Sequence, residues 1–246
     1  MRQIACQQGP FGQIRIMERL RDGARLYCIG DGVQTMSTPD GVSLFGYVHA
    51  IKLLIGNARS VLMLGGGGGS LATMLARRSV CVTVVDIDPA AEDLARRYFG
   101  LDDRVRWITD DAAVFLKSCP NRFDAVVIDA CNASGTVEAF ATAESLVETL
   151  GVVNAGGSLV LNIASDSGPG IPAWQLASAM IDRGFDATLY RPGLGNEGNE
   201  LLHVATDGPR STIRIGSLTG RPRETWLYLG SLEAFTPRQN APRECS

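Results

Sequence analysis

Five consecutive glycines, residues 65–69, separate the apolar stretch VLML from SLATMLARR, a segment of helical character. Such a run costs considerable conformational entropy, which favours a ligand-binding role over tight packing of a strand against a helix. A backbone without side chains lets a nucleotide-like ligand approach the turn closely. Because Ser70 and Leu71 stand where a Lys-Ser/Thr pair is required, the loop is not the P-loop of a nucleoside triphosphatase.

Two ligand classes are compatible with this loop. Gly65, Gly67 and Ser70 approximate the GxGxxG turn of a dinucleotide-binding fold. Gly65, Gly67 and Gly69 equally match the GxGxG turn expected for an adenosyl sulfonium. The loop alone does not choose between the two classes, so residues after the following strands must do so.

Three aspartates lie at the end of a predicted strand or directly after it. Asp86 can accept hydrogen bonds from ribose hydroxyls, although it can also be a strand-end cap, a role that Asp88 fits better. Asp111 can accept a hydrogen bond from an adenine amino group, and a helix N-terminal acid is an equal alternative. Asp129 ends an apolar strand and is expected at a ligand cleft, the alternative being a hydrogen-bonded loop residue that braces Asn132 or Ser134.

In this order, the segments GGGGGS, VVDIDP, DDAAVFL and VVIDACNASG resemble spermidine synthases, which are polyamine aminopropyltransferases with a class I S-adenosylmethionine-dependent methyltransferase fold. The upstream segments GQIRIMERL and DGVQTMSTPDG resemble the N-terminal hairpin and gatekeeping segment of that family, so the similarity covers roughly residues 10–206. The resemblance implies S-adenosylmethionine or its decarboxylated form as donor, with no metal. It implies donor binding by Gln34, Gly65, Gly66, Gly67, Gly68, Gly69, Asp86, Ile87, Asp111, Ala112 and Asp129. It makes Asp129 the catalytic base, with Asn132 in the second acidic position of the same loop.

The chain departs from the family where the polyamine and the arm of the donor are held. Gly68 replaces the loop aspartate; Leu44, Phe45 and Gly46 replace a Tyr-Gln/His-Glu cluster, and Asn132 replaces an acid. Desolvating a polycation without acidic partners is costly, so we expect a poor fit for putrescine. Without the loop acid, repulsion of a donor carboxylate is also lost, so we expect intact S-adenosylmethionine to be preferred.

These features predict a spermidine synthase-like transferase. It binds S-adenosylmethionine and moves a methyl or three-carbon group to a small-molecule nucleophile, with Asp129 as base or orienting group. The alternatives are a genuine aminopropyltransferase that uses decarboxylated S-adenosylmethionine and a non-catalytic adenosyl-binding module. A nicotinamide-dependent oxidoreductase is disfavoured because the sequence contains no Tyr-x-x-x-Lys.

The composition is that of an ordinary globular protein. The 246 residues are 45% hydrophobic with a net charge of −3, which gives no electrostatic case for a nucleic acid or an anionic membrane. Two histidines, and six dispersed cysteines without a CxxC pair, argue against a metal site and for a reducing compartment. The N-terminus has no apolar signal region, so we expect a cytoplasmic protein. For partners we expect a small-molecule acceptor, neither nucleic acid nor membrane, and allow for a homodimer.

Strand and helix signals alternate after residue 60, which predicts a Rossmann-like, mostly parallel seven-stranded sheet. The predicted strands are 60–65, 80–88, 104–110, 123–130, 157–164, 185–193 and 199–207. The predicted helices are 37–54, 69–78, 89–99, 111–118, 140–153 and 172–184. Short strands are expected in 1–36, with turns at Asp22-Gly23 and Asp31-Gly32. The expected units are a β-hairpin segment at 1–38, the adenosyl-binding domain at 39–207 and a C-terminal extension at 208–246.

Overall fold

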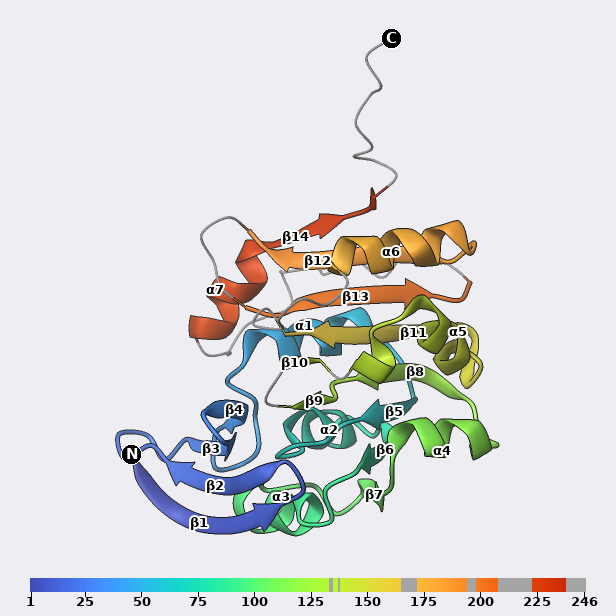
Figure 1. Ribbon diagram of the computed structural model, residues 1–246. Helices are drawn as coiled ribbons and strands as arrows, with labels where there is room; N and C mark the ends of the chain where they lie inside the picture. Colours follow the sequence, from blue (N-terminus) through green and yellow to red (C-terminus); the bar gives the residue numbers. More distant parts are fainter. Residues whose placement is uncertain (133–134, 137, 165–171, 194–197, 208–222, 238–246) are drawn as a thin grey trace.

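The computed structural model describes residues 1–132, 135–136, 138–164, 172–193, 198–207 and 223–237. Eight strands of this part form one mixed sheet (Figure 1). They are β5 (Ser60–Leu64), β6 (Cys81–Asp86), β7 (Arg106–Thr109), β8 (Phe123–Ile128), β11 (Val153–Ile163), β12 (Asp186–Pro192), β13 (Glu200–Ala205) and β14 (Leu232–Phe235). Their order is β14-β12-β13-β11-β8-β5-β6-β7, with β11 to β7 parallel and the other three antiparallel to their neighbours. The fold is therefore the predicted α/β class.

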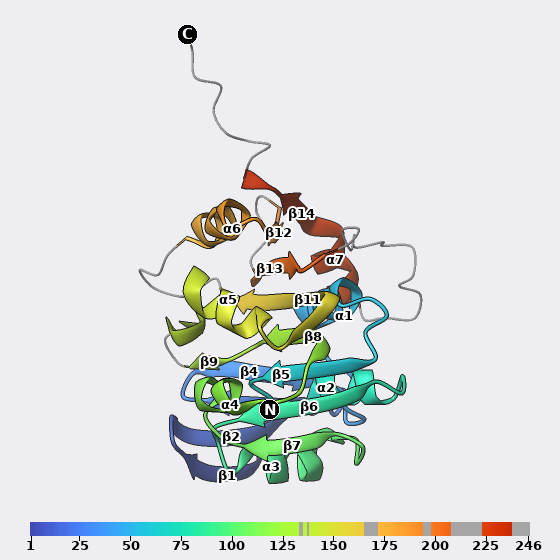
Figure 2. The same cartoon turned by 90° about the vertical axis from the view of Figure 1, so that its right-hand side faces the viewer.

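Helices cover both faces of this sheet (Figure 2). They are α1 (Gly46–Leu54), α2 (Ser70–Ala76), α3 (Ala91–Phe99), α4 (Ala112–Ser118), α5 (Ala143–Leu150), α6 (Ala173–Asp182) and α7 (Arg223–Ser231). In β5, Val61 and Met63 join the apolar cluster of α1 and α2, whereas Leu62 and Leu64 join that of α5 and α6. This alternation of buried side chains explains why the parallel strands read as continuous apolar runs.

The N-terminal segment is a separate antiparallel sheet of four strands in sequence order. Its strands are β1 (Arg2–Gly9), β2 (Gly12–Glu18), β3 (Arg25–Ile29) and β4 (Gly32–Ser37). The sheet packs on α3, because Ile14, Ile16 and Tyr27 share a buried cluster with Leu94 and Phe99. Three short elements, β9 (Cys131–Asn132), β10 (Gly135–Thr136) and the 3-10 helix η1 (Glu138–Phe140), follow β8. No helix in the described ranges is long and apolar enough to cross a membrane.

Several predicted boundaries were wrong for local reasons. The helix expected at 37–54 begins only at Gly46, because Thr38 and Val42 close a turn that contains Gly41 at φ +83°. The turn between β3 and β4 is Gly30-Asp31, one residue earlier than expected. The helix expected from residue 89 begins at Ala91, and the C-terminal extension contributes α7 and the eighth strand, β14.

Candidate functional site

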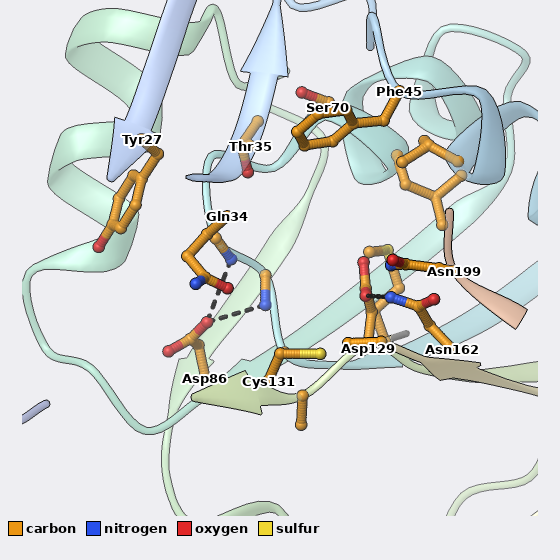
Figure 3. Close-up of a pocket in the computed structure, with 18 of the residues that line it drawn as sticks. Tyr27, Gln34, Thr35, Phe45, Ser70, Asp86, Asp129, Cys131, Asn162 and Asn199 are labelled. Carbon is orange, nitrogen blue, oxygen red and sulfur yellow. Dashed lines mark hydrogen bonds between the residues drawn. The ribbon is translucent and has the colours of Figure 1, made fainter. Parts of the chain in front are cut away.

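One cavity of about 940 Å³ lies where the carboxyl ends of β5, β6 and β8 meet the N-terminal sheet (Figure 3). Glycine-loop residues, side chains of β4 and residues that begin α1 line it together with Tyr228 of α7. Of the predicted site residues, the cavity brings together Gln34, Gly65, Gly66, Gly67, Asp86, Ile87, Asp111, Ala112 and Asp129. Its volume and mixed polar and apolar wall are those of a small-molecule site.

Two glycines of the loop, Gly65 and Gly66, also permit close packing behind the cavity wall. A Cβ at Gly66 would lie 2.7 Å from Cζ2 of the Trp107 indole and would clash with the ring. Gly65, at φ +92°, leaves no room for a Cβ against the backbone of Asp129. Close packing therefore requires glycine at both positions, and both residues also line the cavity.

Gly68 and Gly69 are not brought to the cavity wall. The Gly68 N–H donates to Thr35 Oγ1 at 2.9 Å, and a Cβ at residue 68 would lie 2.9 Å from both Phe99 and Thr35 carbon atoms. Gly69, at φ +71°, faces Leu101. An acid at residue 68 would start between carbon atoms of Phe99 and Thr35, and Thr35 itself lines the cavity.

Asp86 holds the loop in place from the end of β6. Its Oδ2 accepts hydrogen bonds from the N–H groups of Gly66 at 2.8 Å and Gly67 at 3.3 Å, and its Oδ1 accepts from the Asp88 N–H at 2.9 Å (Figure 3). Asp86 therefore has the structural role of a strand-end residue, and it also lines the cavity. Each carboxylate oxygen has more than one lone pair, so these bonds leave acceptor capacity for a ligand.

Asp111 caps α4, as the structural alternative for this residue predicted. Its Oδ1 accepts hydrogen bonds from Ala113 N at 2.8 Å and Val114 N at 3.0 Å. The residue also lines the cavity, as do Ala112 and Ile87, the latter 46% exposed. A wall that offers both an apolar side chain and a carboxylate can receive a flat ring with a polar edge.

Asp129, directly after β8, is the most perturbed acid of the cavity wall. Burial raises its pKa from 3.8 to about 7, and the hydrogen bond from Asn162 opposes this rise. The Asn162 Nδ2 donates to Asp129 Oδ1 at 2.6 Å and fixes the orientation of the carboxyl group (Figure 3). A carboxyl group that titrates near neutrality can exchange a proton with a reacting ligand.

Three other residues around Asp129 were not predicted, namely Asn162, Asn199 and Tyr228. Tyr47, Asn162, Asn199 and Tyr228 line the same part of the cavity, and burial together with the charge of Asp129 raises the pKa of Tyr47 well above its usual value. The sequence offered a sign of Asn162, because this polar residue interrupts the apolar run of β11. It offered no comparable sign of Tyr228, which lies in the C-terminal extension. The side chain of Asn132, the second predicted catalytic residue, lies outside the described part of the structure.

Residues 47–164 match the spermine/spermidine synthase domain. The polyamine aminopropyltransferase of Sulfurisphaera tokodaii is 33% identical over 135 residues, which is 51% of this chain and 45% of that protein. The polyamine aminopropyltransferase of Mycobacterium tuberculosis is 28% identical over 229 residues, 85% of this chain and 42% of the relative. The chain spans about half the length of the curated relatives it matches.

Solved structures show the same fold. A probable spermidine synthase from Corynebacterium glutamicum superposes with a TM-score of 0.76 at 18% identity, covering 97% of this chain and 92% of that one. A spermidine synthase in complex with the transition state analogue AdoDATO gives a TM-score of 0.65 at 22% identity, covering 84% and 74%. Residues 47–164 are thus similar to the spermine/spermidine synthase domain, and the chain has the class I methyltransferase fold of these solved structures.

Proposed function

We propose that this protein transfers the three-carbon arm of decarboxylated S-adenosylmethionine to a small-molecule nucleophile. The observation that carries the proposal is Asp129, a buried carboxyl group with a pKa of about 7, in the same cavity as Asp86 and Asp111. The relatives named polyamine aminopropyltransferases support transfer of the arm over transfer of a methyl group.

The residues of the cavity fit the adenosyl part of such a donor. In this proposal Asp86 accepts hydrogen bonds from the ribose hydroxyls, and Asp111 accepts one from the adenine amino group. Ile87 and Ala112 supply the apolar surface for the adenine ring. When bound, the donor supplies a sulfonium whose neighbouring carbon is open to nucleophilic attack.

In this proposal Asp129 orients the nucleophile of the acceptor and then accepts its proton. Its unprotonated form accepts a hydrogen bond from the nucleophile and orients it towards the electrophilic carbon. As the new bond to carbon forms and the carbon–sulfur electron pair remains on sulfur, Asp129 takes the proton that the nucleophile releases. Asn162 keeps the carboxyl group in one orientation through this exchange.

The choice of the decarboxylated donor differs from the expectation based on Gly68. That expectation required residue 68 to face the arm of the donor, whereas Gly68 packs against Phe99 and Thr35. For the choice of donor, we therefore rely on the similarity to polyamine aminopropyltransferases and not on the missing loop acid. Methyl transfer from intact S-adenosylmethionine becomes a competing outcome of the experiment.

Calorimetric titration with decarboxylated S-adenosylmethionine, S-adenosylmethionine and NAD tests the donor. Turnover is followed by release of methylthioadenosine or S-adenosylhomocysteine with a panel of small amines. We expect binding of the decarboxylated donor and release of methylthioadenosine. Asp129→Asn should retain donor affinity and lower turnover by about 10²-fold or more. Release of S-adenosylhomocysteine would establish methyl transfer, binding without any product would indicate an adenosyl-binding module, and binding of NAD alone would refute the proposal.

A further inference from the structure

The ring of Tyr228, on α7, is held between two glycines at the edge of the cavity. A Cβ at Gly46, the first residue of α1, would clash with Tyr228 Cβ and lie 2.6 Å from its Cγ. A Cβ at Gly198 would lie 2.8 Å from Cε2 of the same ring. The ring therefore fills the space between α1 and the segment before β13, and it touches the backbone on both sides.

The hydroxyl group fixes the far end of the Tyr228 side chain. It donates to the Asn199 carbonyl oxygen at 2.5 Å. Burial, and then the charge of Glu200, raise the pKa of Tyr228, so the hydroxyl group remains a hydrogen-bond donor. Asn199 lines the cavity, and Figure 3 shows it on the same side as Asp129 and Asn162. Tyr228 therefore connects α7 to the segment that brings Asn199 to the cavity.

The other contact of Tyr228, with Gly46, lies between two aromatic residues of the cavity wall. The rings of Phe45 and Tyr47 are stacked, with centroids 5.6 Å apart and an interplanar angle of 25°. Figures 1 and 2 show α7 beside α1, and the two helices are in contact. Because Tyr228 packs on the backbone between the two stacked residues, the docking of α7 supports both rings.

Tyr47 links this packing to the carboxyl group of Asp129. Burial raises the pKa of Tyr47 well above its usual value, and nearby charges add to the rise. These charges are those of Asp129, Cys131 and Tyr228. Because such interactions weaken with distance, the three groups lie around the Tyr47 hydroxyl. Tyr228 thus belongs to the wall at the end of the cavity where Asp129 lies.

We propose that Tyr228 is a positioning residue, which holds Tyr47 and Asn199 around Asp129 and helps to exclude water from that carboxyl group. It acts from α7, through the start of α1 and the segment before β13. The inference rests on the proposed function for the reaction in which Asp129 takes part. It does not rest on that function for the packing, which is tested without any ligand.

Turnover and donor affinity separate this role from a general loss of folding. The donor is decarboxylated S-adenosylmethionine, and putrescine, cadaverine and 2-phenylethylamine serve as probe amines. Tyr228→Ala should lower kcat by at least about tenfold, since a misplacement of about 1 Å can cost about 10²-fold. Its affinity for methylthioadenosine should stay within about twofold of wild type, because Asp86 is unchanged. Tyr228→Phe keeps the ring and should retain kcat within about threefold, as should Leu227→Ala, which alters an exposed neighbour.

A pair of glycine substitutions tests the contact between α1 and Tyr228. Gly46→Ala adds a methyl group that clashes with Tyr228, so it should lower kcat by at least about fivefold. Gly230→Ala adds the same group on α7, where a Cβ would meet no atom within 4 Å, and it should leave kcat unchanged. Similar kcat values for these two variants would overturn the proposal.

A measurement without ligand tests the exclusion of water from Asp129. Asp129→Asn is introduced into wild type and into Tyr228→Ala, and urea-induced unfolding of all four proteins is followed at about pH 5 and about pH 8. The pH-dependent gain in stability from asparagine should fall to about half or less in the Tyr228→Ala background, because water then reaches the carboxyl group.

An unchanged gain would overturn the proposal, as would wild-type kcat in a folded Tyr228→Ala. If that variant does not fold, Tyr228→Leu, which keeps an apolar side chain, takes its place under the same criteria. Absence of turnover in wild type counts against the proposed function alone, because the unfolding comparison needs neither donor nor acceptor.

Discussion

Replacing Asp129 with asparagine should make the protein increasingly more stable than wild type as the pH rises from about 4 to about 7. Burial raises the pKa of Asp129 from 3.8 to about 7. Between these values the folded state binds a proton that the unfolded state has lost, so wild-type stability falls as the pH rises. The asparagine variant has no such proton, and its amide oxygen can still accept the hydrogen bond from Asn162.

The size of the effect follows from the two pKa values. Their difference, about three pKa units at about 1.4 kcal/mol each, sets a ceiling of about 4 kcal/mol on the change in the free energy of unfolding. Asp129 lines a cavity that a ligand must be able to enter, so solvent relaxes part of this penalty. We expect a pH-dependent gain of about 1–3 kcal/mol for Asp129→Asn over wild type.

Urea-induced unfolding of both proteins at about pH 5, 6, 7 and 8 measures this difference. Asp124→Asn is a matched control at the other end of β8. The Arg59 N–H and the Asn154 amide lower the pKa of Asp124, so its stabilising contribution is already complete above its unfolded pKa of 3.8. The control should be less stable than wild type by a constant amount across this range. A constant or shrinking difference for Asp129→Asn would refute the reasoning.

Three further outcomes are expected. Asp86→Ala should weaken methylthioadenosine binding by about 1–3 kcal/mol in calorimetry, and unchanged affinity would leave Asp86 with a role in holding the loop alone. Gly68→Asp should lower stability by about 1–3 kcal/mol in thermal unfolding, because its Cβ meets Phe99 and Thr35, and the affinity ratio of the two donors should not change. A donor switch without lost stability would show that residue 68 faces the donor. Turnover should rise with pH through about 7 as Asp129 loses its proton, and a flat profile from about pH 6 to pH 8 would exclude Asp129 as the base.

The sequence was sufficient to predict the strands at whose ends the cavity residues lie. Parallel strands that are buried on both faces must be apolar throughout. The apolar runs of β5 and β8 could therefore be recognised as strands from the sequence alone. Polar residues that end these runs, among them Asp86 and Asp129, lie at one edge of the sheet because parallel strands share their carboxyl ends. Turns and helix starts were less accurate, since the turn at Gly41 is closed by hydrogen bonds between Thr38 and Val42 that composition does not reveal.

Only the tertiary structure decided which way residue 68 faces and which residues surround Asp129. Gly68 has no side chain whose polarity could indicate its environment, and its neighbours Thr35 and Phe99 come from distant parts of the chain. The pKa of Asp129 depends on burial by elements that are not adjacent in sequence. Tyr228 reaches the cavity because α7 packs on α1 and Gly46 leaves room for its ring. The sequence determined the cavity aspartates, which stand at the ends of successive strands, whereas Asn162, Asn199 and Tyr228 reach the cavity through long-range packing.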